Sequence, residues 1–327
     1  MNIKTMSKSD LRREIVLLLA YPFIRFAILI VRVLPKSSRN KLAVFIGNFS
    51  YRFNKKTRTR TLGNLTIGYG EVKSSEEIET MAREVLINLN KSIIDHFATA
   101  HITNRTEFFK FVTVMGEEHL RKAYEQKRGV ICLIPHLSSW ELSAVTPPML
   151  GYKSCGASKN VKGFLLHRMM VGFRERRGMR NISREGSYET LVKALNAGEC
   201  LIIMIDQDTK VKGLFVDFYG KKAYTPMGVA RLALETNAIV VPMATTRLAD
   251  SSYQFTIYPA IETIRTGDTE KDLYANTQLE TKVMETIIRE APTQWVWMHH
   301  RWKTTPENLK IYLERRALEK QLNAQKK

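Results

Sequence analysis

The sequence predicts an α/β protein with a largely parallel central sheet flanked by helices, preceded by a membrane-associated helical segment. From about residue 129, short apolar runs alternate with stretches of helical periodicity, which is typical of a parallel sheet covered on both faces. Upstream lies one long, strongly apolar stretch, residues 15–31. We therefore expect a membrane-anchoring helix (1–36), an α/β domain (37–306) and a basic helical tail (307–327).

The apolar stretch "IVLLLAYPFIRFAILIV" (15–31) is slightly shorter than the about 20 apolar residues of a membrane-spanning helix. It also contains Pro22 and Arg25. Lys and Arg flank both of its sides, so the positive-inside rule gives no orientation, and no small-residue cleavage site follows it. These features favour a helix lying in, or partly entering, a cytoplasmic leaflet with anionic lipid. The alternative is a buried helix of the soluble core.

Two helical regions follow the apolar stretch. Residues 38–66 are predicted to be helical and include the very basic run "RFNKKTRTRTLGNL". This run is either a solvated face or a surface for lipid headgroups or an acidic partner. Ser74 to Glu77 open a long amphipathic helix that continues to about Ala100, because Ser with Glu three residues later is a capping box. Its apolar residues recur at helical spacing and belong to the core.

The alternating region is expected to contain five strands and four helices. The strands are predicted at 129–135, 152–158, 180–183, 200–206 and 238–247, and the helices at 139–150, 163–177, 187–197 and 226–236. Ligands of such sheets bind outside the carboxyl ends of the strands. The polar residues that follow predicted strands are His136, Ser158 to Asn160, Arg184 and Asp206 to Asp208. We therefore expect the functional site along this edge.

Composition restricts the partners of the chain. Lys and Arg number 51 against 32 Asp and Glu, a net charge of +19. Such an excess indicates an anionic partner: nucleic acid, an anionic membrane surface, or an acidic protein or substrate. The three cysteines, Cys132, Cys155 and Cys200, have no CxxC spacing, and two lie in or beside apolar runs. They are interpreted as reduced core thiols, neither disulfides nor metal ligands.

The stretch "LIPHLSSWELS" (133–143) places a base and an acid at a strand end. A neutral imidazole is well suited to take a proton from a hydroxyl, and a carboxylate on its other nitrogen fixes the tautomer. We predict that His136 is this base and that Glu141, in the first turn of the next helix, holds it. The sequence contains no GxSxG or HExxH motif. The base is therefore predicted to activate a hydroxyl of a bound substrate.

Several stretches together resemble one enzyme family. "PHLSSWE" is similar to the HxxxxD/E signature of glycerolipid acyltransferases. The others resemble the branch that includes the late lauroyl and myristoyl acyltransferases of lipid A biosynthesis. They are "RTRTLGNL", "SKNVKGFLLHRMMVGFRERRGM", "IDQDTKVKGLFVDFYGKKAYTPMGVARLA", "IVVPM" and "QWVWMHHRWKTTP". The matches run in order from about residue 55 to 306, so the resemblance covers nearly the whole chain.

The resemblance implies transfer of a fatty acyl group from an acyl carrier protein thioester to a hydroxyl of a phosphorylated glycolipid, a lipid A precursor. It places the catalytic domain on the cytoplasmic side of an inner membrane. The paired acids Asp206 and Asp208 suggest magnesium, but acyl transfer from a thioester does not require a metal, so we expect no metal and no cofactor. His136 and Glu141 are expected to be catalytic, and backbone N–H groups of the following helix to hold the oxyanion. The expected substrate-binding residues are Lys159, Asn160, Arg174, Arg177, Arg184, Asp206, Gln207 and Asp208. For the two aspartates, loop capping is the alternative.

Other functions stay open at the level of sequence. The acceptor is alternatively another (lyso)phospholipid or glycolipid, and the same dyad activating water would make a thioesterase. A basic nucleic-acid-binding protein is the remote alternative. We expect no nucleic-acid partner, because the sequence contains no recognisable nucleic-acid module and its most apolar segment resembles a lipid-facing helix.

Overall fold

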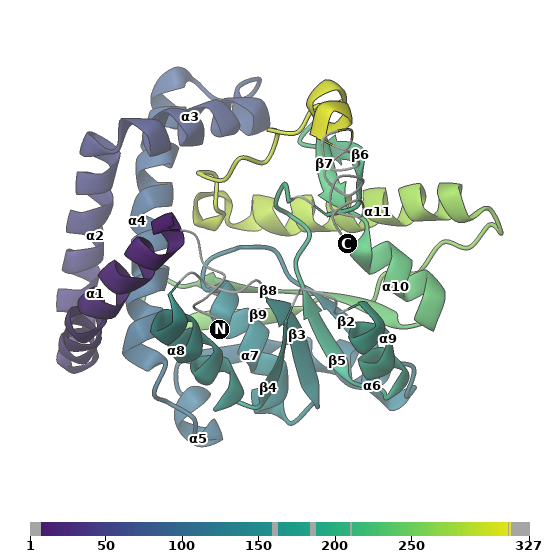
Figure 1. Ribbon diagram of the computed structural model, residues 1–327, viewed down its shortest axis with the longest axis horizontal. Helices are drawn as coiled ribbons and strands as arrows, with labels where there is room; N and C mark the ends of the chain where they lie inside the picture. Colours follow the sequence, from purple (N-terminus) through teal and green to yellow (C-terminus); the bar gives the residue numbers. More distant parts are fainter. Residues whose placement is uncertain (1–7, 159–162, 184–187, 210, 313, 315–327) are drawn as a thin grey trace.

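The computed structural model describes residues 8–158, 163–183, 188–209, 211–312 and 314 (Figure 1). The strands are β1 (Val112–Met115), β2 (Val130–Leu133), β3 (Ser154–Ser158), β4 (Met179–Ser183), β5 (Cys200–Ile203), β6 (Gly213–Phe218), β7 (Lys221–Pro226), β8 (Ile239–Arg247) and β9 (Tyr253–Ile257). The helices are α1 (Lys8–Val33), α2 (Lys36–Phe53), α3 (Lys55–Tyr69), α4 (Ser75–Thr99), α5 (Arg105–Phe108), α6 (Glu117–Glu125), α7 (Trp140–Leu150), α8 (Phe164–Glu175), α9 (Tyr188–Asn196), α10 (Gly228–Thr236) and α11 (Thr269–Glu290). A 3₁₀ turn, η2, spans Pro292–Gln294.

The described residues form a seven-stranded sheet in the order β1-β9-β8-β2-β5-β3-β4. Strands β8, β2, β5, β3 and β4 are parallel, whereas β9 runs antiparallel to β8. This arrangement confirms the predicted α/β fold. Because β2 and β5 are parallel neighbours, with Val130 opposite Cys200, their carboxyl ends lie side by side.

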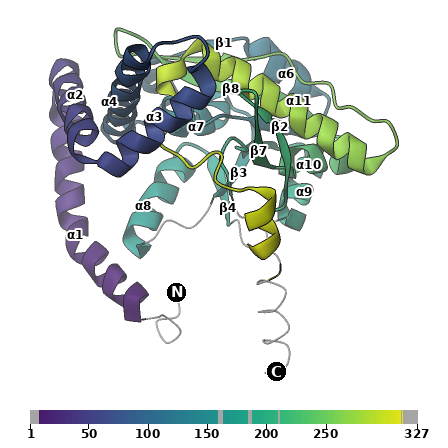
Figure 2. The same ribbon diagram turned by 90° about the horizontal axis from the view of Figure 1, so that it is seen from above.

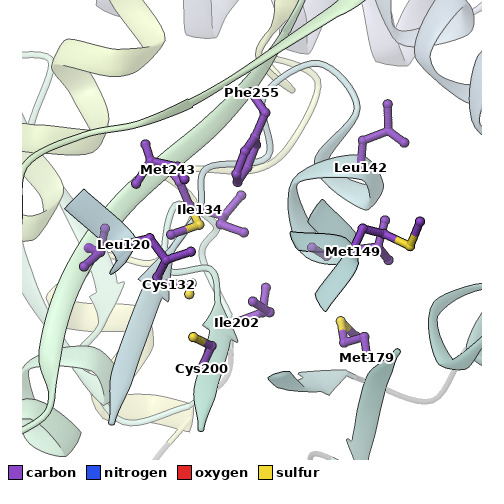
Figure 3. Packing of buried hydrophobic residues seen from close by; sticks show 14 of the residues in the cluster. Leu120, Cys132, Ile134, Leu142, Met149, Met179, Cys200, Ile202, Met243 and Phe255 are labelled. Atoms are coloured by element: carbon purple, nitrogen blue, oxygen red, sulfur yellow. The ribbon is translucent and has the colours of Figure 1, made fainter. Parts of the chain in front are cut away.

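The central strand β2 is buried on both faces, as expected for a parallel sheet with helices on either side. Val130 and Cys132 pack into one cluster with side chains of α6 and α7, part of which Figure 3 shows. Ile131 and Leu133 pack into another cluster with α9 and α10. All three cysteines are free and buried, which confirms their interpretation as core thiols.

Helices α1, α2 and α4 lie side by side at one end of the molecule (Figures 1 and 2). Helix α4 begins with the predicted capping box, in which Ser74 and Glu77 each bond the other's backbone N–H. Helix α2 approaches α4 closely because Gly47 has no side chain; a Cβ there would lie 2.6 Å from the Cα of Ile87. These helices place the N-terminal segment against the α/β domain.

Residues Leu11–Val33 of α1 are long and apolar enough to cross a membrane by length and composition. Only one face of the helix packs on the protein: Ile28 is buried against Met169 and Phe173 of α8. The opposite face exposes apolar side chains, among them Phe23 (74% exposed) and Val33 (74%). Helix α1 therefore carries both a packed face and an uncovered apolar face, which an amphipathic interfacial helix would place in lipid.

Several elements differ from the sequence-based prediction. The region 38–66 is two helices that separate at Asn54, whose side chain caps α3. The segment between the strand predicted at 200–206 and the helix predicted at 226–236 contains the β6–β7 hairpin, which turns at Tyr219 and Gly220, both with positive φ. Two consecutive left-handed residues suit a tight hairpin turn, and Gly at the second position is the usual signal. Strands β1 and β9 and helix α11 were also not predicted.

Candidate active site

His136 and Asp206 meet at the carboxyl edge of the sheet, where β2 and β5 end. The imidazole Nδ1 lies 2.6 Å from Asp206 Oδ1, and the backbone N–H of His136 donates to Oδ2 at 2.6 Å. The indole N–H of Trp295 donates to the same Oδ2 at 2.8 Å. The carboxylate is thus held at both oxygens, and it in turn fixes the imidazole in one orientation.

Asp206 is fully buried, yet it stays a carboxylate. Burial alone would raise its pKa, but the charge of His136 and the hydrogen bonds from His136 and Trp295 outweigh burial and hold the pKa below its ordinary value. With Nδ1 directed at this carboxylate, Nε2 is the nitrogen left to act as a base. No described residue bonds Nε2, and the His136 side chain is 20% exposed. A substrate hydroxyl can therefore reach it.

The predicted contact between His136 and Glu141 is wrong. Both oxygens of Glu141 bind the guanidinium of Arg174, at 2.8 Å to Nε and 2.5 Å to Nη2. The physical reason is burial. Glu141 is buried in the first turn of α7, facing α8, and a buried carboxylate without a paired cation would strongly destabilise the fold. Burial would raise the pKa of Glu141, but Arg174 outweighs it and keeps the pKa below its ordinary value.

The arginines at the end of α8 have separate contacts. Arg174 pairs with Glu141, as described above. Arg177 is buried and donates to the carbonyls of Ile102 (3.0 Å) and Thr99 (2.6 Å) at the C-terminal end of α4. These bonds tie Arg177 to the last residue of α4 and to the segment that follows it, and substrate binding by Arg177 stays a prediction. Burial lowers the pKa of Arg177 to about 10.

The remaining predicted site residues are placed as follows. Asp206 is buried and holds His136, and its predicted contact with substrate stays a prediction. Asp208 accepts from the backbone N–H (2.7 Å) and hydroxyl (2.8 Å) of Thr304, which is the loop-capping alternative. Gln207 lies between them, half-buried. Lys159, Asn160 and Arg184 lie outside the described residues.

The turn after His136 is tightly constrained. Ser138 has a φ of 47°, and its backbone N–H donates to the carbonyl of Gln294 at 2.8 Å. The N–H groups of residues 136 and 138 are therefore already bonded. In the first turn of α7 the N–H of Leu142 donates to the carbonyl of Ser139, so among the described residues the amides without a bonded acceptor there are those of Trp140 and Glu141. The hydroxyls of Ser138 and Ser139 are buried without a partner among the described residues.

The segment after α11 packs against the site, which was not expected from the sequence. Trp295 bonds Asp206, and Gln294 bonds both the backbone N–H (2.9 Å) and the carbonyl (3.0 Å) of Arg247 at the end of β8. Asn64 of α3 donates to the carbonyls of Trp297 and His299, both at 2.7 Å. In the sequence, this contact between α3 and the terminal segment was indicated only by the fact that "RTRTLGNL" and "QWVWMHHRWKTTP" both resemble segments of the same enzyme family.

We expect Asn64→Ala to lower the free energy of unfolding by about 1–3 kcal/mol, because it leaves two carbonyls without their buried donor. Urea unfolding followed by tryptophan fluorescence would measure this loss. Asn90→Ala is the matched control, since among the described residues the Asn90 amide bonds only the carbonyl of Leu86 in its own helix. Equal effects of the two substitutions would contradict the proposed link between α3 and the terminal segment.

Within the described part of the chain, no group of three or more His, Cys, Asp or Glu residues is placed to hold a metal ion. An imidazole held by a buried carboxylate suits proton transfer from a hydroxyl, and unbonded amides at a helix start suit an oxyanion.

Comparison with known proteins indicates one family. Residues 11–304 match the family model of bacterial lipid A biosynthesis acyltransferases. The chain is 28% identical over 273 residues to the lipid A biosynthesis palmitoleoyltransferase of Escherichia coli, covering 81% of this chain and 85% of that protein. It is 23% identical over 295 residues to a lipid A biosynthesis acyltransferase of Haemophilus influenzae, covering 88% of each. A phosphatidylinositol mannoside acyltransferase of Mycolicibacterium smegmatis is 25% identical over 193 residues, 58% of this chain and 62% of that protein.

Proposed function

The chain belongs to the bacterial lipid A biosynthesis acyltransferase family, and we propose that it moves a fatty acyl group from an acyl carrier protein thioester to a hydroxyl of a phosphorylated glycolipid. Members of this family are O-acyltransferases of lipid A biosynthesis. The observation that carries the proposal is the His136–Asp206 pair, with Nε2 of the imidazole free of described partners.

The reaction proceeds by direct transfer. Nε2 of His136 takes the proton of the acceptor hydroxyl while Asp206 stabilises the imidazolium that forms. The acceptor oxygen attacks the thioester carbonyl, and free amides in the first turn of α7 stabilise the oxyanion. Collapse of the tetrahedral intermediate breaks the carbon–sulfur bond, and the departing thiolate takes the proton from His136. The base is regenerated without an acyl-enzyme.

Glu141 and Arg174 have a positioning role in this mechanism. Their two hydrogen bonds join the first turn of α7 to the end of α8. The first turn of α7 follows directly after the loop that carries His136. The pair therefore fixes the amides of α7 relative to the base, although it contacts neither His136 nor Asp206.

The proposed donor is acidic, and a basic surface lies next to the terminal segment. His300 lies mostly exposed at this surface. Its slight burial lowers its pKa, and the nearby charges of Arg60, Lys303 and Lys56 lower the pKa further. This surface, Lys56, Arg60, His300 and Lys303, suits an acidic carrier protein. The acceptor side is supported by relatives that are named for acylating lipid A and phosphatidylinositol mannoside, both glycolipids.

The proposal is tested with purified protein, an acyl carrier protein thioester, and lipid A precursor as acceptor. Mass spectrometry is expected to detect one added acyl chain on the glycolipid, with release of free carrier protein only when the acceptor is present. Release of fatty acid at the same rate without the acceptor would instead make the chain a thioesterase. A trapped acyl-enzyme would contradict direct transfer.

We also propose that α1 anchors the catalytic domain on the cytoplasmic face of the inner membrane. Changing Phe23, Phe26 and Val33 together to Ser removes apolar area from the uncovered face and leaves the packed Ile28 unchanged. Vesicle binding is expected to weaken by about 100-fold or more, since burying each such side chain is worth about 1.5–3 kcal/mol. Val72→Ser is the control, because Val72 is 76% exposed outside α1. Unchanged binding of the triple variant would place the anchor elsewhere.

A further inference from the structure

A cavity of about 310 Å³ lies between the N-terminal helix α1 and helix α8 of the α/β domain. Helix α1 lines it with Arg25, Phe26, Leu29 and Arg32, and helix α8 with Met169 and Phe173. The walls therefore combine two guanidinium groups with aliphatic and aromatic side chains. No residue of the His136 site is among them.

A third guanidinium belongs to the same region. Arg176, at the C-terminal cap of α8, lies over the ring of Phe173 at 5.3 Å from its centroid and interacts electrostatically with Arg32. The Nε of Arg32 is buried and has no hydrogen-bond partner among the described residues. In the part of the chain that the structure describes, none of Arg25, Arg32 and Arg176 forms an ion pair with a carboxylate.

Three like charges close together repel one another, and a buried N–H without an acceptor costs free energy. An anion with several acceptor oxygens would remove both penalties. Arginine suits phosphate in particular, because its planar fork matches two phosphate oxygens at once. The charges of this cavity therefore indicate a phosphate group.

The apolar walls determine which kind of phosphate fits. Phe26 and Leu29 line the cavity and are nevertheless 62% and 56% exposed, so the cavity opens on the uncovered apolar face of α1. Free phosphate would leave these side chains in water. A lipid, in contrast, would place its phosphate on the arginines and its chains along Phe26 and Leu29, in continuity with the apolar face that we place in the bilayer.

We propose that the cavity between α1 and α8 binds the phosphate of an anionic membrane phospholipid through Arg25, Arg32 and Arg176. Bound lipid would join α1 to the catalytic domain and so fix the height of the active site above the bilayer. This inference rests on the proposed function only in placing α1 at a membrane.

Vesicle binding by the full-length protein tests the proposal. The measured quantity is the ratio of affinities for phosphatidylcholine vesicles with and without phosphatidylglycerol. Arg32→Gln is expected to lower this ratio by about fivefold, as each basic residue near an anionic surface contributes about 1 kcal/mol. Arg52→Gln on α2 is the matched control, because Arg52 is exposed and does not line the cavity. Leu29→Trp narrows the cavity without changing charge and is also expected to lower the ratio.

The outcomes separate the sources of an effect. An equal decrease for Arg32→Gln and Arg52→Gln, with none for Leu29→Trp, would mean that only the general surface charge attracts anionic lipid, and would overturn the site. A different result would be that inorganic phosphate also abolishes the preference for vesicles with phosphatidylglycerol at concentrations near that of the lipid phosphate. In that case the site binds free phosphate and the lipid assignment is wrong. Failure to bind either vesicle would contradict membrane association itself, whereas transfer to a detergent-dispersed acceptor would still support the proposed activity.

Discussion

His136→Ala is expected to lower the rate of acyl transfer by about 10²- to 10⁴-fold, because it removes the base that takes the proton of the acceptor hydroxyl. Steady-state kinetics with carrier protein thioester and glycolipid would measure the loss. The fold is expected to stay intact, since His136 lies at a partly exposed strand end. His119→Ala, on the distant helix α6, is the matched control. Near-normal turnover of the His136 variant would contradict the mechanism.

The same kinetic assay distinguishes Asp206 from Glu141 as the partner of the imidazole. Asp206→Asn keeps the shape of the side chain but removes the charge that stabilises the imidazolium, and its amide nitrogen cannot accept from Nδ1. It should lower kcat with little change in KM for the acceptor. Glu141→Gln removes a charge that interacts with His136 electrostatically but makes no hydrogen bond to it among the described residues, so its effect on kcat is expected to be smaller. A loss of kcat for Glu141→Gln in a fully folded protein, without a loss for Asp206→Asn, would restore the partner that the sequence predicted.

The sequence predicts most of the parallel sheet because strand and helix patterns there are local. The run of apolar residues at 129–135 is long enough to show a buried strand, and the capping box at Ser74 marks the start of α4. The hairpin β6–β7 was missed because its second strand lacks the alternation of a half-buried strand: exposed Lys221 and Lys222 are followed by a run of buried residues. Strand β1 has only four residues and is fixed by pairing with β9, which lies far away in sequence.

The active site is harder to predict because its key contact joins residues 70 positions apart. The sequence indicates that His136 and Asp206 each follow a strand. Only the strand order shows that these two strands are neighbours, so that the two side chains meet. Glu141, in contrast, is close to His136 in sequence, and this proximity made it the predicted partner. Its burial, which requires Arg174 beside it, is a property of tertiary packing.

The arginines of α8 illustrate the same limit. Arg174 and Arg177 were both predicted to bind substrate, and Arg176 lies between them in the sequence. In the fold, successive helical positions point in different directions. Arg174 consequently pairs with Glu141, Arg177 holds α4, and Arg176 lies near α1. A cluster of arginines in the sequence therefore indicates that negatively charged groups lie close to it in the fold. It does not show which arginine contacts which of these groups.

Breaking the Glu141–Arg174 pair is expected to have the largest effect on stability. Both side chains are mostly buried, with 11% and 17% of their side-chain surface exposed. Glu141→Gln leaves the guanidinium of Arg174 without its counterion and should lower the free energy of unfolding by about 3–5 kcal/mol. Chemical denaturation in a mild detergent would measure it. Glu77→Gln is the control: its pair with Lys73 is exposed to solvent, so its loss should cost much less than loss of the buried pair.

The pH dependence of stability provides a second measurement of the same pair. The pKa of Glu141 in the folded protein lies below its ordinary value of 4.5, because Arg174 outweighs burial. A carboxylate whose pKa is lowered by folding stabilises the folded state at pH values above its pKa in the unfolded chain. This stabilisation is lost as the pH falls through its pKa in the folded protein. The wild-type protein should therefore lose this contribution only below pH 4.5, and the difference from Glu141→Gln should narrow there. A difference that stays constant from neutral to acidic pH would mean that Glu141 contributes through packing and not through its charge.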